Sequence, residues 1–86
     1  MKNVKEIQII PIKANNGLVA FASIVFENSL FLGSIGVHKL LDGSGYRITY
    51  PTKKIGNKNM NIYHPIDRQT SRLIEDAIIK KVEEIM

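Results

Sequence analysis

The segment Leu18–Glu27 constrains the fold of this chain more than any other. Alternate residues of an extended strand point to opposite faces, and in this segment both faces are largely apolar. Such a pattern is typical of a strand that is covered on both sides. One helix can cover one face, and the chain has few residues left to cover the other. We therefore predict that a second copy covers the second face, which makes the protein a homodimer.

The preceding segment, Val4–Lys13, also alternates apolar side chains and is predicted to be a strand. Its Pro11 cannot donate a hydrogen bond to a neighbouring strand, so we expect this strand at a sheet edge or with a bulge at that point. The residues Asn15, Asn16 and Gly17 tolerate positive φ. They predict a hairpin turn between the first two strands.

A third strand is predicted over Leu30–Leu41, after a turn at 28–29. It contains Gly33 and Gly36, which we expect to be bulges or points of close approach. The segment Tyr46–Tyr50 is rich in β-branched and aromatic residues, which favour a fourth strand.

The remainder of the chain is predicted to hold a loop, a short strand and a helix. Pro51–Asn59 is polar and basic and is expected to be a loop, and Met60–Tyr63 a short fifth strand. From Asp67 to the end the apolar residues recur at helical spacing. Asp67 is the expected N-cap, with Thr70 and Ser71 as alternatives. The predicted apolar face of the helix consists of Ile74, Ala77, Ile78, Val82 and Ile85.

Strands followed by one helix predict an α+β fold, with an antiparallel sheet of four to five strands and a C-terminal amphipathic helix. The chain has 86 residues, which suit a single domain spanning 1–86. It has no cysteines for disulfides or thiolate metal sites, so self-association is the remaining common route to extra buried area. No run of about 18 apolar residues appears. We therefore expect a cytoplasmic protein without a membrane span.

The chain shows no combination of residues that predicts catalysis or metal binding. The histidines at 38 and 64 do not have metal-site spacing. The acidic residues fall in predicted turns, at a helix cap or on a helix surface, and not as a catalytic pair. The loop that begins at Asp42 lacks the lysine of a phosphate-binding loop. We expect no enzyme activity, no cofactor and no small-molecule substrate. His64 precedes a proline, and we interpret it as bonding to the backbone at the strand-to-helix corner, with a ligand contact as the alternative.

The basic residues are more informative, because the net charge is +4. If the basic loop packs near the helix start, its lysines would join the helix arginines and the N-terminal amides in one anion-attracting surface. The candidate nucleic-acid-binding residues are Arg47, Lys53, Lys54, Lys58, Arg68 and Arg72. The alternative interpretation is a solvated loop that keeps the protein soluble. The tyrosines at 46, 50 and 63 could stack on bases, although strand tyrosines more often belong to a core or an interface.

Four pieces of the chain form a specific combination: Gly45–Lys54, Gly56, Asn61–Ile66 and Arg72. Together they resemble the signature of the SpoVG (stage V sporulation protein G, septation regulator) family. The order of elements is also similar over nearly the whole chain. The resemblance places Lys53 and Lys54 in the basic loop of the family and Arg72 at its helix arginine.

The resemblance implies an α+β fold, a homodimer formed through the sheet, and a small cytoplasmic regulator of septation or sporulation that binds DNA or RNA. It implies no catalysis and no cofactor. The third strand departs from the family pattern, because Gly36 replaces an arginine and Lys39 an acidic residue. Two hypotheses remain: a regulator of the cell cycle that contacts phosphates, or an adaptor that binds a protein in cell division or developmental control.

Overall fold

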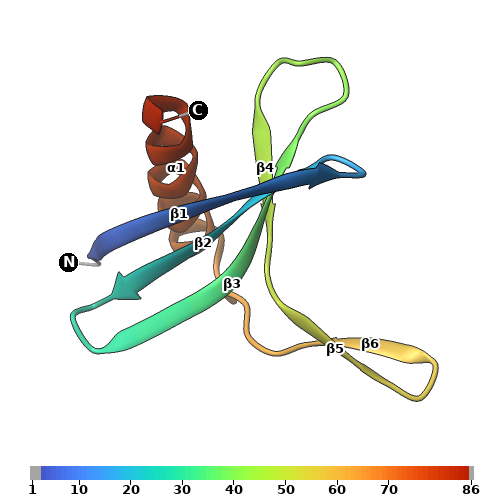
Figure 1. Cartoon of the computed structure of the whole chain (residues 1–86). Helices are drawn as coiled ribbons and strands as arrows, with labels where there is room; N and C mark the ends of the chain where they lie inside the picture. The colour runs from blue at the N-terminus through green and yellow to red at the C-terminus, as the bar shows by residue number, and fades with distance from the viewer. Residues whose placement is uncertain (1–2, 86) are drawn as a thin grey trace.

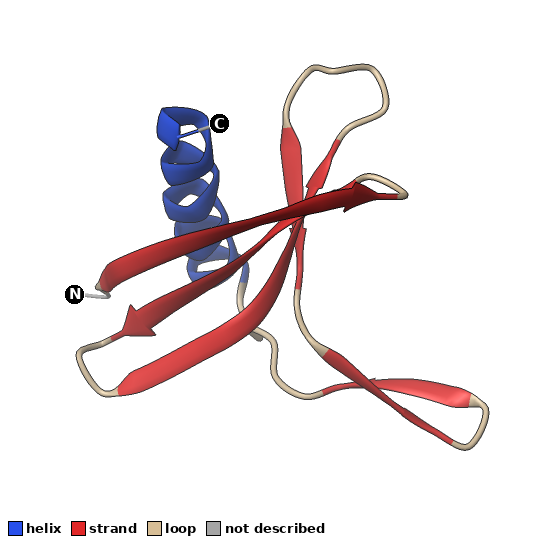
Figure 2. Ribbon diagram, viewed as in Figure 1, coloured by secondary structure: helices blue, strands red, loops and turns tan. Residues whose placement is uncertain are grey.

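The structure is a computed structural model that describes residues 3–85. Within them, six strands precede one helix: β1 (Val4–Asn15), β2 (Leu18–Phe26), β3 (Leu30–Lys39), β4 (Tyr46–Thr49), β5 (Thr52–Ile55), β6 (Lys58–Asn61) and α1 (Arg68–Ile85). The first four strands form an antiparallel sheet in the order β1-β2-β3-β4, and β5 and β6 form a separate sheet (Figures 1 and 2). The predicted α+β fold is confirmed.

The inner strand β2 has one buried and one open face. Ala20, Ala22 and Ile24 are at most 2% exposed and form the core together with β3 and α1. On the other face Phe21 is 38% exposed. The helix lies against one side of the sheet and contacts β1 and β4 there (Figure 1). Both faces of β2 are therefore apolar, as predicted, and α1 covers one of them.

The predicted irregularities of β1 and β3 are present. β1 lies at the sheet edge, and its register with β2 shifts between Pro11 and Asn15. In β3 the register shifts at Gly33 and Ser34, and Ser34 has a φ of 59°. Gly36 is a point of close approach, since a Cβ there would lie 2.8 Å from Oγ1 of Thr49.

The helix begins where the sequence predicts. The backbone N–H of Thr70 donates to Oδ1 of Asp67 over 2.7 Å, and its hydroxyl donates to Oδ2 over 2.9 Å. Asp67 is therefore the N-cap. The buried face of α1 consists of Thr70, Ile74, Ile78 and Val82. Ile85 was predicted on this face but is 51% exposed in the final turn. The predicted last helical residue, Met86, lies outside the described residues.

The prediction for 51–63 is wrong in part. Instead of a loop and a late strand, β5 and β6 pair as a hairpin through a turn at Gly56 and Asn57. Gly56 has a φ of 62°, which suits the first central position of a two-residue hairpin turn. Both strands are mostly polar and every residue in them is exposed, so they lack the apolar alternation on which the sequence prediction relied. The pairing instead depends on backbone hydrogen bonds.

Candidate functional site

The β5–β6 hairpin, residues 52–61, projects away from both the four-stranded sheet and the helix (Figure 1). Every residue in its two strands is exposed. Three of the six basic residues singled out from the sequence lie on it, namely Lys53, Lys54 and Lys58. An isolated two-stranded hairpin is marginally stable in water. The β5–β6 hairpin therefore needs contacts with the rest of the protein at the end where its two strands leave the main sheet and enter the helix segment.

Two tyrosines provide that support. Tyr50 precedes β5 and Tyr63 follows β6, and their rings meet edge to face with centroids 5.9 Å apart. The hydroxyl of Tyr63 donates to the carbonyl oxygen of Gly33 over 2.6 Å. The N–H of Ile62 also donates to the carbonyl of Pro51 over 2.9 Å. The base of the hairpin is thereby attached to the bulge of β3.

The electrostatics of the two rings agree with a structural role. Burial, and to a smaller degree the neighbouring Tyr50, raise the pKa of Tyr63 to about 12, so its hydroxyl remains a donor at physiological pH. Burial also raises the pKa of Tyr50, and the side chain of Ser71 lowers it to a smaller degree. The hydroxyl of Tyr50 is buried and makes no hydrogen bond within residues 3–85. Both tyrosines, and Tyr46, pack against the core, which favours the core interpretation over base stacking.

Replacing Tyr63 by phenylalanine is expected to lower the free energy of unfolding by about 1 kcal/mol, because one part-buried hydrogen bond is lost. Urea titration measures this loss, and amide hydrogen exchange should be faster in residues 52–61. Tyr46→Phe is the matched control, since the hydroxyl of Tyr46 makes no hydrogen bond within residues 3–85. Equal losses in the two variants would show that the bond to Gly33 does not support the hairpin.

The register divides the side chains of the hairpin between two faces. Residues directly opposite each other share a face, and Lys53 is opposite Met60, Lys54 opposite Asn59. The mixed face carries Lys53, Ile55, Lys58 and Met60. The polar face carries Thr52, Lys54, Asn59 and Asn61. The neighbouring lysines at 53 and 54 therefore point in opposite directions.

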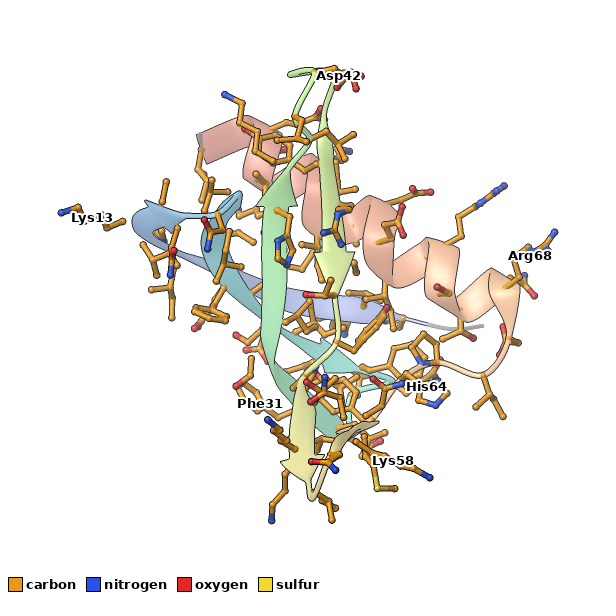
Figure 3. The ribbon with its side chains drawn as sticks, turned by 90° about the vertical axis from the view of Figure 1, so that its right-hand side faces the viewer. Lys13, Phe31, Asp42, Lys58, His64 and Arg68 are labelled. Atoms are coloured by element: carbon orange, nitrogen blue, oxygen red, sulfur yellow. The ribbon has the colours of Figure 1, made fainter. Side chains whose placement is uncertain are left out.

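The six predicted residues do not form one surface within a single chain. Arg68 and Arg72 lie at the start of α1, and Arg47 lies on β4 opposite His38. Figure 3 shows the side chains of Lys58 and Arg68 well apart. The expected packing of the basic segment against the helix start does not occur, because the hairpin extends away from the helix.

The three groups of basic residues differ in their surroundings. None of the six forms an ion pair within residues 3–85. Arg68 and Arg72 border a surface hollow together with Glu75 and Asp76, so two carboxylates offset their charge. On the hairpin no acidic residue occurs. The hairpin therefore carries three lysines and no carboxylate of its own to offset their charge.

His64 occupies the corner that leads into the helix, where Figure 3 shows its side chain. Its Nδ1 lies 3.1 Å from the carbonyl oxygen of Pro65. Since that oxygen can only accept, Nδ1 donates, and the predicted bond to the backbone is confirmed. Among the described residues no group of three or more potential ligands is placed to hold a metal ion. Within the same residues, no helix combines the length and apolarity needed to cross a bilayer.

The open face of the four-stranded sheet is the second candidate surface. It exposes Ile10 (60%), Phe21 (38%) and Phe31 (72%). Ile10 is paired with Phe21, and Phe31 with Val25, so all of them share the face opposite the helix. From the sequence, an apolar second face was predicted only for β2. The strand register shows that Ile10 of β1 and Phe31 of β3 belong to the same face.

Comparison with known proteins gives a consistent result. The model of the SpoVG family matches residues 1–84. A protein from Clostridium perfringens (strain SM101) is 32% identical over 85 residues, covering 96% of this chain and 91% of its own length. One from Onion yellows phytoplasma is 31% identical over 96% of this chain and 83% of its own. One from Archaeoglobus fulgidus is 26% identical, over 98% of each. All three carry the name "Putative septation protein SpoVG".

Proposed function

The chain belongs to the SpoVG family, and from this premise we propose that it is a small homodimeric regulator in the cytoplasm that binds DNA or RNA. It has no catalytic activity of its own. The names of its relatives point to septation as the regulated process. The observation that carries the proposal is the projecting β5–β6 hairpin, whose three lysines have no ion pair within residues 3–85.

Such a hairpin suits the phosphate backbone of a nucleic acid. Its lysines are exposed, and no carboxylate on the hairpin competes for them. Lysine contacts to phosphates displace condensed counterions and supply most of the affinity of non-specific binding. They position the protein but do not read sequence. A two-stranded ribbon also has the right size to enter the major groove of B-form DNA.

Of the two faces, the polar face is the better candidate for the nucleic-acid contact. Lys54 lies there beside Thr52, Asn59 and Asn61, and hydroxyl and amide groups bond readily to phosphates and base edges. The mixed face instead exposes Ile55 and Met60, at 55% and 53%. Contact through the mixed face would place these two apolar side chains against charged phosphates.

The double variant Lys53→Ala/Lys54→Ala is expected to bind DNA and RNA about tenfold more weakly at 0.1 M salt, because the phosphate contact of Lys54 and the neighbouring charge of Lys53 are both removed. The slope of log affinity against log salt should become less steep by about one, since one phosphate contact is lost. Electrophoretic mobility shifts across a salt series measure both effects. Lys80→Ala/Lys81→Ala, on α1, removes the same charge elsewhere and should leave binding nearly unchanged. An unchanged affinity of the hairpin variant would contradict the proposal.

The single variants distinguish the two faces, because they change the charge equally at adjacent positions. Lys54→Ala should account for most of the loss, and Lys53→Ala for little of it. A larger loss for Lys53→Ala would assign the contact to the mixed face instead.

For the dimer, we propose that the open face of the sheet is the contact. The exposed edge of β1 is poorly suited to pairing with another strand, since Pro11 lacks a donor and the register shifts twice along the strand. The open face offers Ile10, Phe21 and Phe31, and burial of such apolar area stabilises association. An adaptor role would use the same face for another protein. The mass of the purified protein in solution distinguishes these two uses.

A further inference from the structure

The β5–β6 hairpin has two free edges, because β5 and β6 pair only with each other among the described residues. Figure 1 shows the hairpin projecting from the fold. A free edge carries backbone N–H and C=O groups without a partner strand, and it is a template for pairing with another chain. A two-stranded hairpin is also marginally stable alone, and three or more strands are needed for independent stability. The hairpin therefore gains stability when a further strand is added to it.

The hydrogen-bonding phase of the hairpin shows which residues present the free backbone groups. The N–H of Ile62 donates to the carbonyl of Pro51 over 2.9 Å, so these two residues are a hydrogen-bonded pair. Hydrogen-bonded and non-hydrogen-bonded pairs alternate along an antiparallel ladder. With the register of the hairpin, Asn59 and Asn61 therefore direct their backbone groups away from β5. Neither residue makes another backbone hydrogen bond within residues 3–85.

The outer edge of β6 is complementary to itself. When two copies of β6 run antiparallel with Met60 opposite the partner's Met60, Asn59 stands opposite the partner's Asn61. Both asparagines direct their backbone groups outward, so the two such pairs form four backbone hydrogen bonds. The two methionines, each 53% exposed in the single chain, then lie side by side. Lys58 lies opposite the partner's Ile62 and not opposite another lysine, so no like charges stand directly opposite each other.

The outer edge of β5 is less suited to such a pairing. Its outward backbone groups belong to Thr52 and Lys54. A pairing of two copies centred on Lys53 sets one lysine directly opposite the other, and a pairing centred on Lys54 does the same. Like charges directly opposite each other destabilise a sheet. Of the two edges of the hairpin, β6 is therefore the edge that fits a second copy.

We propose that β6 pairs with β6 of a second copy and thereby joins neighbouring dimers on one nucleic acid. The inference rests on the proposed function, which supplies the dimer and the nucleic acid. Pairing uses the backbone of β6 and the mixed face, so Lys54 and the rest of the polar face stay open to phosphates. Four hydrogen bonds and two methionines make a contact far smaller than the roughly 1,000 Å² of a stable interface. The contact therefore forms where dimers are bound side by side and the effective concentration of one hairpin near the next is high.

The chain has no cysteines, which allows a test by disulfide formation. In the proposed register the two substituted positions of Met60→Cys form a non-hydrogen-bonded pair with Cα atoms about 4.5 Å apart, which suits a disulfide. Ile55→Cys is the matched control, since Ile55 lies on the same face with similar exposure, 55% against 53%, but belongs to β5. Under mild oxidation, Met60→Cys should form covalent pairs about tenfold faster than Ile55→Cys, and DNA should increase the difference. Denaturing gels without reductant measure both rates, and equal rates would overturn the pairing.

Cooperativity on nucleic acid provides the second test. The wild type should bind cooperatively to a duplex that is long enough for several dimers. Met60→Glu should lower the Hill coefficient to about 1, because two carboxylates would stand opposite each other in the pairing. Ile55→Glu is the control, since it adds the same charge on the same face and also stands opposite a lysine of its own hairpin. It should keep the cooperativity of the wild type, and both variants should bind alike to a duplex that holds one dimer.

The two tests separate a failure of the pairing from a failure of the proposed function. A wild type that binds a long duplex without cooperativity, or a Met60→Glu variant that is as cooperative as the wild type, overturns the pairing and leaves nucleic-acid binding intact. A wild type that binds no nucleic acid overturns the proposed function. In that case, preferential disulfide formation by Met60→Cys in protein alone would still demonstrate the contact between two copies of β6.

Discussion

The double variant Ile10→Glu/Phe31→Glu is expected to be a monomer at concentrations where the wild type is a dimer. Both side chains are at least 60% exposed in the single chain, so the fold of the monomer should survive the change. In the proposed dimer they are buried between two sheets. Two carboxylates at such positions would lose their hydration without a partner, so the dissociation constant should rise roughly 100-fold or more.

Sedimentation or light scattering across a concentration series measures this effect. The matched control is Leu41→Glu/Ile66→Glu, which introduces the same charge at apolar residues that are more than 90% exposed and lie outside the open face. It should remain a dimer. A wild type that stays monomeric throughout, or an Ile10→Glu/Phe31→Glu variant that stays dimeric, would contradict the proposed contact.

Loss of the dimer should also weaken nucleic-acid binding. Two hairpins on one particle convert the second contact into an intramolecular one, which raises the overall affinity. The monomeric variant should therefore bind more weakly than the wild type although its lysines are intact. Such a result would connect the open face to the function of the hairpin.

Replacing Ile78 by alanine is expected to have the largest effect on stability, with a loss of about 2 to 5 kcal/mol. Its side chain is 0% exposed and belongs to the core between α1 and the sheet. Removal leaves a cavity that a small domain compensates poorly. Urea unfolding measures the loss, and it should be done at one fixed protein concentration because the proposed dimer would contribute to stability.

Ile85→Ala is the control, since it makes the same change on the same helix at a residue that is 51% exposed. Its loss should be well below that of Ile78→Ala, because less apolar area returns to water. Similar losses would mean that the final turn is covered in solution, as its helical spacing alone suggests. The comparison therefore tests a point where the structure differs from the sequence prediction.

Two predictions that depend on residues close together in the sequence were confirmed. Asp67 caps the helix because its carboxylate needs only the N–H and hydroxyl of Thr70, three residues later. The edge position of β1 follows from the missing donor of Pro11. The hairpin was missed because Thr52–Ile55 and Lys58–Asn61 lack an apolar alternation, although Gly56 and Asn57 form a turn signal of the expected kind.

The amino-acid sequence by itself determined the α+β fold, the apolar character of both faces of β2, the helix start and the identity of the basic residues. These depend on local periodicity and on the chemistry of single side chains. Only the tertiary structure decided that Lys53 and Lys54 point to opposite faces, because strand pairing sets the face of each residue. It also decided that the backbone groups of Asn59 and Asn61 point to the free edge of β6. The apolar strand Leu18–Phe26 required a cover on both faces, and the structure shows that α1 supplies one of them.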